Sequence, residues 1–153
     1  MPQDKQEPPS SSEMRAFAYR LLGRREYSEF ELGQRIRLKW PGADGITELV
    51  AALVEENLVS DERFTESFIR SRLQRFQGPM KIRAALRAKG VSDSIIAGQL
   101  HTGAIDWTEL ASAWLQRQHP DELTFDVKKK YYRRLTSRGF THDQAMDALK
   151  QQP

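Results

Sequence analysis

Two runs of basic side chains are the residues of this sequence whose type and spacing could do chemistry. Eight lysines and arginines lie between Arg63 and Lys89, where Glu66 is the only acid. Six more lie between Lys128 and Arg138, with no acid among them. Clustered guanidinium and ammonium groups bind phosphates and carboxylates, so the runs predict an anionic partner, either nucleic acid or an acidic protein surface. The alternative is that they form solvated helix faces and bind nothing.

The charge of the chain is unevenly distributed along its length. The 153 residues carry a net charge of +3. Residues 1–12 contribute −1, 13–58 contribute −1, 59–103 contribute +4 and 104–153 contribute +1. The positive charge is therefore concentrated in the middle of the chain, where a partner of opposite charge would be attracted.

Residue patterns that accompany catalysis or metal binding are not found in the sequence. The chain has no cysteine, which excludes disulfides and thiolate ligands. His101, His119 and His142 do not stand at metal-ligand spacing from one another or from paired acids. There is no glycine-rich phosphate loop and no G-x-S-x-G motif. We therefore expect a protein that is not an enzyme and that uses no cofactor or metal.

Targeting features are also missing from the sequence. No apolar run approaches the roughly 20 residues of a membrane span. The first residues, MPQDKQEPPSSSE, contain neither the charged nor the apolar region of a signal peptide. We expect a cytoplasmic, monomeric protein with no membrane partner.

The central basic run is placed on three short helices, each with its own start signal. Ser60 is a predicted N-cap for a helix that ends near Phe76. The next helix begins at Pro79, directly after Gly78, and ends near Lys89 before Gly90. A third helix, capped by Ser92, runs to about His101.

Similar start signals and apolar stripes predict three helices on either side of the centre. The predicted N-caps of five of these helices are Ser12, Ser28, Asp106, Thr124 and Thr141. The remaining helix carries its apolar stripe from Ile46 to Val54 and stops at Asn57. The aromatic side chains at core spacing are interpreted as packing residues, although Trp40 and Tyr132 are left open.

The predicted helices fall into three units of three helices behind a disordered tail. The tail is residues 1–12, which are rich in proline and serine. The units are 13–58, 59–103 and 104–153. At an offset of 49 residues Gly90 matches Gly139, and apolar, basic and capping residues match around them, so an internal repeat is favoured over coincidence.

The centre of the sequence resembles the RecX family of bacterial recombinase regulators. The similar stretches are LVSDERF, from Leu58, and SRLQRFQGPMKIRAALRAKGV, from Ser71. The positions that match are Asp61, Arg63, Phe64, Arg72, Gly78, Ile82, Leu86, Lys89 and Gly90. The stretch from Ala18 to Leu32 is similar to the opening of that family. The resemblance covers about residues 13–150 and is weaker in the third unit.

The resemblance implies a fold and a function. The fold is all-α, with three tandem three-helix repeats in an elongated, curved array. The function is modulation, mainly inhibition, of the RecA recombinase: binding to the RecA filament on single-stranded DNA, restraint of ATP hydrolysis and strand exchange, and limitation of filament growth. Recombination, DNA repair and the SOS response would be regulated in this way.

Two other functions stay open, direct binding of single- or double-stranded DNA through the basic repeats and a passive helical scaffold. A tandem array could contact successive subunits of a filament and gain effective concentration at each contact. The basic residues expected to meet RecA or DNA phosphate are Arg70, Arg72, Arg75, Lys81, Arg83, Arg87, Lys89, Lys129, Lys130, Arg133 and Arg134.

Arg72 is the least certain member of this set because it lies on the apolar ridge between Phe68 and Phe76. A structural role would have its guanidinium bond helix-end carbonyls or a carboxylate such as Glu55 or Glu56. A functional role would have it reach RecA or phosphate.

Overall fold

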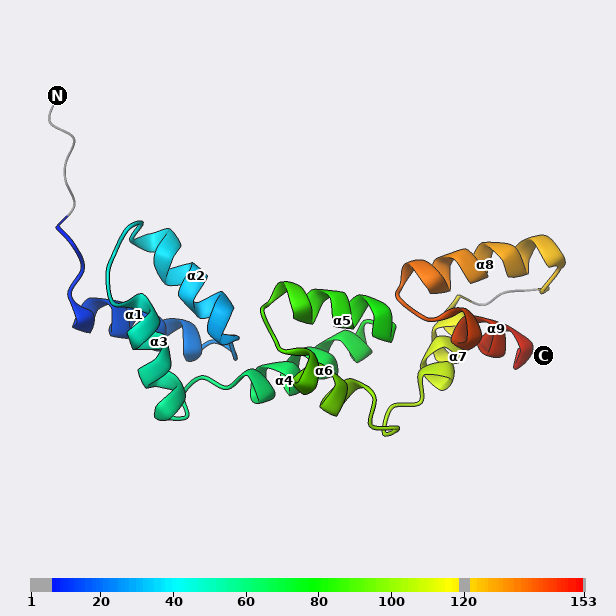
Figure 1. The fold of residues 1–153 in the computed structure, drawn as a ribbon. Coiled ribbons are helices and arrows are strands. Elements are labelled where there is room, and N and C mark those ends of the chain that lie inside the picture. Colours follow the sequence, from blue (N-terminus) through cyan, green and yellow to red (C-terminus); the bar gives the residue numbers. More distant parts are fainter. Residues whose placement is uncertain (1–6, 119–121, 153) are drawn as a thin grey trace, which may run out of the picture. The chain divides into compact units, whose positions relative to one another are not determined.

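The computed structural model describes residues 7–118 and 122–152, and within these ranges every regular element is an α-helix (Figure 1). The helices are α1 (Ser11–Leu22), α2 (Glu29–Lys39), α3 (Ile46–Glu55), α4 (Asp61–Gln74), α5 (Pro79–Ala88), α6 (Asp93–Leu100), α7 (Trp107–Arg117), α8 (Phe125–Ser137) and α9 (His142–Lys150). The predicted all-α helical array is thus confirmed.

The chain packs as two compact units. Unit 1 comprises Met1–Phe64 and Lys89–Val91, and unit 2 comprises Thr65–Ala88 and Ser92–Pro153. The predicted division into three repeats, with boundaries at 58 and 103, stays a prediction.

Unit 1 is built on an apolar core between α1, α2 and α3. Leu32, Ile36 and Leu53 are completely buried in it. Phe17 and Trp40 pack edge to face at its border, with ring centroids 5.5 Å apart. The ring of Trp40 is therefore a packing group, which answers the question that the sequence left open.

Unit 2 buries apolar side chains from two sets of helices. Ile82 and Leu86 of α5 are fully buried, and Ile96 and Leu100 of α6 are at most 2% exposed. Leu115, Leu135 and Ala145 form the centre of a second cluster on α7, α8 and α9. These buried side chains determine which faces of α5 and α8 point inward. These two helices carry most of the basic residues of the two runs.

Most predicted helix starts are confirmed by side-chain caps. The hydroxyls of Ser28, Ser60, Ser92, Thr124 and Thr141 each accept a hydrogen bond from the backbone N–H three residues later, and the Asp106 carboxylate does the same. The predicted stop at Asn57 is also confirmed, because this residue adopts φ 60° directly after the C-cap of α3.

Three sequence predictions about helix ends are wrong or fall outside the described residues. The cap of α1 is Ser10 instead of Ser12, because Glu13 bonds back to the Ser10 N–H in a capping box. Residues 11 and 12 consequently belong to α1 and not to the predicted tail, of which residues 1–6 lie outside the described chain. The predicted stop of α7 at His119 and Pro120 also lies outside it.

In unit 1 the segment after α5 packs against the start of α2. Gly90 adopts φ 76°, and a Cβ built on it would lie 2.6 Å from Phe30 Cβ. The Ser28 hydroxyl donates a hydrogen bond to the Lys89 carbonyl oxygen at 2.7 Å. A side chain at position 90 would therefore meet both backbone strain and a steric clash.

In unit 2 the turn after α8 packs against the start of α5 in a similar way. Gly139 adopts φ 100°. The Gly78 N–H donates to the Arg138 carbonyl oxygen at 2.8 Å, and the Met80 N–H donates to the Gly139 carbonyl oxygen at 2.9 Å. Lys89 and Arg138, which are 49 residues apart, thus hold the same place in two turn contacts.

Candidate partner-binding surface

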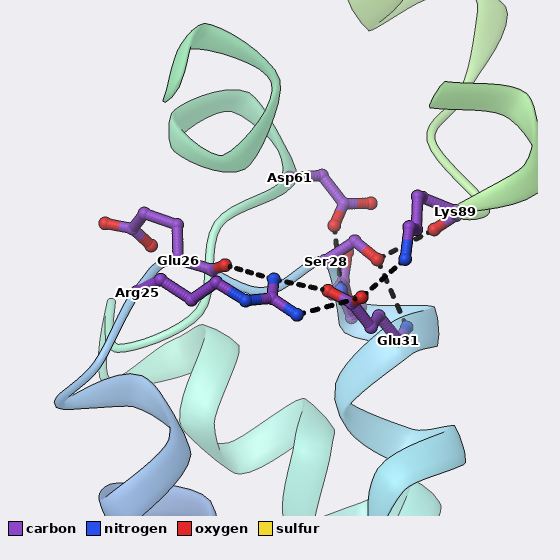
Figure 2. A network of polar contacts seen from close by, with 7 residues as sticks. Arg25, Glu26, Ser28, Glu31, Asp61 and Lys89 are labelled. Atoms are coloured by element: carbon purple, nitrogen blue, oxygen red, sulfur yellow. Dashed lines mark hydrogen bonds and ion pairs between the residues drawn. The ribbon is translucent and has the colours of Figure 1, made fainter. Parts of the chain in front are cut away.

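Lys89 belongs to a polar network in unit 1 that surrounds the buried carboxylate of Glu31 (Figure 2). The Lys89 ammonium lies 2.6 Å from Glu31 Oε2. The Arg25 guanidinium donates to both oxygens of Glu31, at 2.8 and 3.1 Å. The Glu31 side chain is only 9% exposed, so its charge is matched mainly by these two cations.

The network shifts the pKa of its acids in opposite directions. Burial opposes the charged form of Glu31, but the hydrogen bonds and charges of Arg25 and Lys89 outweigh it and hold the pKa of this carboxyl below its usual value. Burial and the adjacent Asp61 carboxylate raise the pKa of Glu29. Asp61 also accepts a hydrogen bond from the Glu29 N–H at 2.9 Å.

At the start of α2 the predicted N-cap forms, but a reciprocal capping box does not. Ser28 accepts from the Glu31 N–H as predicted, at 3.1 Å. The Glu31 carboxylate does not return to the Ser28 N–H but binds Arg25 and Lys89. Lys89, predicted as a partner-binding residue, is therefore engaged within the protein.

Arg138 has a comparable internal role in unit 2. Its Nε donates to the Phe76 carbonyl oxygen at 3.0 Å, and a second guanidinium nitrogen donates to the Arg75 carbonyl oxygen. Burial lowers the pKa of Arg138. The side chain therefore binds the turn that follows α4, where Phe76 adopts φ 56°.

Of the six predicted residues between Arg70 and Arg87, which lie on α4, directly after it or on α5, three contact other side chains of the protein. Arg70, Arg75 and Lys81 are exposed. Arg83 contacts the His101 ring nitrogen Nε2, and Arg87 pairs with Asp93 at 2.8 Å. Arg83 and Arg87 are therefore less available to a partner than their place on one helix face suggested. The ion pair of Arg87 is mostly exposed, however, and contributes little stability.

The third of these internally engaged residues, Arg72, meets neither kind of partner that the sequence suggested. It is half-buried, and its guanidinium carbon lies 4.5 Å from the centre of the Phe68 ring. Glu56, one suggested partner, instead pairs with Arg15 at 2.9 Å. Arg72 is therefore held by a cation–π contact on its own helix.

The exposed basic residues of α8 stand beside aromatic rings. Lys129 lies 5.2 Å from the ring centre of Phe125. Lys130 and Arg134 lie 5.8 and 5.7 Å from the ring centre of Tyr131. These side chains combine positive charge with apolar contact area, which suits them to an anionic partner with apolar or aromatic groups.

A shallow pocket beside α8 is lined by Trp114 and three arginines. Its lining is Trp114, Arg133, Arg134, Ser137 and Arg138. Sequence reasoning did not include Trp114 or Arg138 in the site. The 49-residue repeat pairs Arg138 with Lys89, and the structure shows that both belong to a turn contact, whereas no local signal in the sequence places Trp114 beside these arginines.

Two further observations limit the chemistry of the described chain. In residues 7–118 and 122–152, no group of three His, Asp or Glu side chains is placed to hold a metal ion. Within the same ranges no helix has the length and apolar content needed to cross a membrane.

These observations define a class: an all-α protein of short, capped helices with a run of exposed cations on α8. A family model described as "RecX, second three-helix domain" matches residues 60–98. Regulatory protein RecX of Chromohalobacter salexigens is 43% identical over 134 residues, which cover 86% of this chain and 88% of that protein. Regulatory protein RecX of Haemophilus influenzae (strain PittEE) is 38% identical over 142 residues, 89% of this chain and 93% of that protein. The chain belongs to the RecX family.

Solved structures share the fold. The crystal structure of RecX from Lactobacillus salivarius superposes with a TM-score of 0.78 at 21% identity, covering 91% of this chain and 94% of that one. A second, a crystal structure of regulatory protein RecX, gives a TM-score of 0.73 and covers 92% of this chain.

Proposed function

We propose that this protein binds the RecA filament on single-stranded DNA and inhibits it, restraining ATP hydrolysis, strand exchange and filament growth. The observation that carries the proposal is the similarity, over most of the chain, to proteins named regulatory protein RecX. Regulation of recombination, DNA repair and the SOS response, and a cytoplasmic location, follow from the same proposal.

The proposed mechanism is binding without catalysis. Supporting it, the chain has no cysteine, and the two described histidines contact other side chains, His101 with Arg83 and His142 with Tyr132. The exposed side chains of Arg70, Arg75 and Lys81 offer positive charge to an acidic protein surface.

The test is RecA's DNA-dependent ATPase, measured with and without substoichiometric protein. We expect a lower rate with the wild-type chain. A double variant, Arg83→Glu and Arg87→Glu, should inhibit less while keeping its helical circular dichroism, because the lost internal contacts are exposed or half-exposed. The matched control is Arg24→Glu with Arg35→Glu, two exposed cations of unit 1 outside the predicted set. Unchanged ATPase at an excess of wild-type protein would refute the proposal.

A second candidate function is direct DNA binding, favoured by the six basic residues of the Lys128–Arg138 run and by the arginine-lined pocket at Trp114. Guanidinium groups around a shallow hollow suit phosphate oxygens. Binding to bare DNA without RecA separates the two functions. Tight binding at physiological salt, with a steep loss as salt rises, would favour this second function.

A further inference from the structure

An open groove runs between α8 and α9 in unit 2. Neither the family comparison nor the predicted set of basic residues accounts for the apolar side chains that line its floor. Its volume is about 650 Å³. Its lining is Phe125, Lys128, Lys129, Tyr132, Arg133, His142, Met146, Leu149 and Lys150. Most of the lining comes from one face of α8 and the facing residues of α9.

The floor of the groove is apolar. The Tyr132 hydroxyl and His142 Nδ1 hydrogen-bond each other at 2.8 Å, and their rings meet edge to face at 5.6 Å. The contact occupies the Tyr132 hydroxyl and one of the two ring nitrogens of His142, so the Tyr132 ring contributes mainly carbon to the groove. Phe125 is 74% exposed and Met146 36% exposed, so the groove holds two exposed large apolar side chains.

The walls of the groove are basic. Lys128, Lys129, Arg133 and Lys150 line it, and no carboxylate is among the lining residues of this described region. An apolar floor between ammonium and guanidinium groups complements a ligand that has large apolar groups on one side and negative charges on its flanks.

The length of the groove indicates the size of the ligand. Phe125, Lys129 and Arg133 follow one another at four-residue spacing along α8, which at 1.5 Å per residue is about 12 Å. This length accommodates roughly two turns of a bound helix, the arrangement in which amphipathic helices lie in a groove between two others. Besides its aromatic rings, which could stack on nucleotide bases, the groove offers the aliphatic side chains of Met146 and Leu149, which suit the apolar side chains of a peptide.

We propose that the α8–α9 groove binds an acidic amphipathic peptide segment of a partner protein, with its apolar side chains on Phe125, Tyr132 and Met146 and its carboxylates on the flanking cations. Lys129 and Arg133 also belong to the set predicted to meet RecA or phosphate. The proposal does not require the partner to be RecA, because it concerns a class of peptide.

The test is a direct titration of the full-length protein with fluorescent probes, in the absence of RecA. The probe is a designed helical peptide with leucine and phenylalanine on one face and glutamate on the other. Three controls are the same peptide with serine for the apolar residues, the same peptide with lysine for glutamate, and an oligothymidine of similar length. We expect the acidic amphipathic peptide to bind at least about tenfold more tightly than each control.

Two variants locate the binding. Met146→Glu places a carboxylate on the apolar floor and should weaken binding of the acidic amphipathic peptide at least about tenfold. The matched control is Met80→Glu, a methionine of α5 that is 52% exposed and outside the groove. Phe125→Ser should also weaken binding of the acidic amphipathic peptide. Because Phe125 is 74% exposed, its loss should leave the fold intact, so this variant decides the question if Met146→Glu alters the circular dichroism.

The proposal is overturned if the acidic amphipathic peptide does not bind, or if both groove variants bind it as wild type does. It is also overturned if oligothymidine binds more tightly and loses affinity in the groove variants, since the groove would then be a nucleic-acid site. Because RecA is absent from the titration, none of these results depends on the ATPase experiment.

Discussion

Replacing Glu31 by glutamine tests whether the network around this residue stabilises unit 1. The substitution keeps the size of the side chain and removes the charge that faces Arg25 and Lys89. Hydrogen bonds to charged groups contribute about 1.5–3 kcal/mol each. The cations are 44% and 40% exposed, so the lower value applies to each.

The expected loss follows from these values. Two contacts at the lower value give about 3 kcal/mol, of which a glutamine amide recovers about 1 kcal/mol through one neutral hydrogen bond. We therefore expect Glu31→Gln to lower the free energy of unfolding by about 2 kcal/mol. With a typical dependence of 1–3 kcal/mol per molar urea, the unfolding midpoint should fall by about 1 M.

The assay is urea unfolding followed by far-ultraviolet circular dichroism. Glu48→Gln is the matched control, because Glu48 is an exposed acid of α3, and it should change stability by less than about 0.5 kcal/mol. Lys89→Met and the double variant complete a thermodynamic cycle, in which a coupling of about 1 kcal/mol is expected between residues in contact. An unchanged midpoint for Glu31→Gln, or strictly additive effects of the two changes, would refute the reasoning.

The effect of pH gives an independent check with a defined sign. The pKa of Glu31 is lowered in the folded protein, so the stabilisation by its charge is complete above the unfolded pKa of about 4.3 and is lost as pH falls through the folded value. Glutamine cannot titrate, so the difference between wild type and Glu31→Gln should shrink in acid below that value. Taking this difference also removes the opposite contribution of Glu29, which both proteins share.

Two further predictions concern unit 2. Gly78→Ala should destabilise the protein by at least about 2 kcal/mol in urea unfolding, because its Cβ would overlap the backbone of Gly139 and the following residue, whereas Gly98→Ala, with nothing near its Cβ, should be neutral or stabilising. Arg72→Ala should cost less than about 1 kcal/mol, the scale of a partly exposed cation–π contact with Phe68. With melting near normal, a loss of RecA inhibition would assign Arg72 to binding, whereas a loss of several kcal/mol would contradict the cation–π account.

The helices could be predicted from the sequence because their signals are local. An N-cap hydroxyl or carboxylate accepts a hydrogen bond from the N–H three residues later, so the pair is visible in any window of four residues, as at Thr141 with Gln144. The error at Ser12 is of the same kind: Ser10 stands three residues before Glu13, which is the spacing that a capping box requires.

The candidate site could be predicted only in part because its contacts are not local. The partner that engages Lys89 lies 58 residues away, and the carbonyls bonded by Arg138 lie 62 and 63 residues away. A count of basic residues along the chain cannot separate such cations from exposed ones. Met146 likewise has the spacing of a core residue, because it lies three residues before the buried Leu149, and its exposure depends on how α8 and α9 pack.

The positions of Lys89 and Arg138 therefore change how the basic runs are interpreted. Each cation stands directly before a glycine of positive φ, and each turn contacts the start of another helix through a hydrogen bond to the carbonyl of that same cation. Their side chains hold the turn in place, Lys89 through Glu31 and Arg138 through the end of α4. Charge at these two positions serves folding, so the capacity to bind an anionic partner must come from the exposed cations. Of the predicted set these are Arg70, Arg75, Lys81 and Arg87, which lie on α4, directly after it or on α5, and Lys129, Lys130, Arg133 and Arg134 on α8.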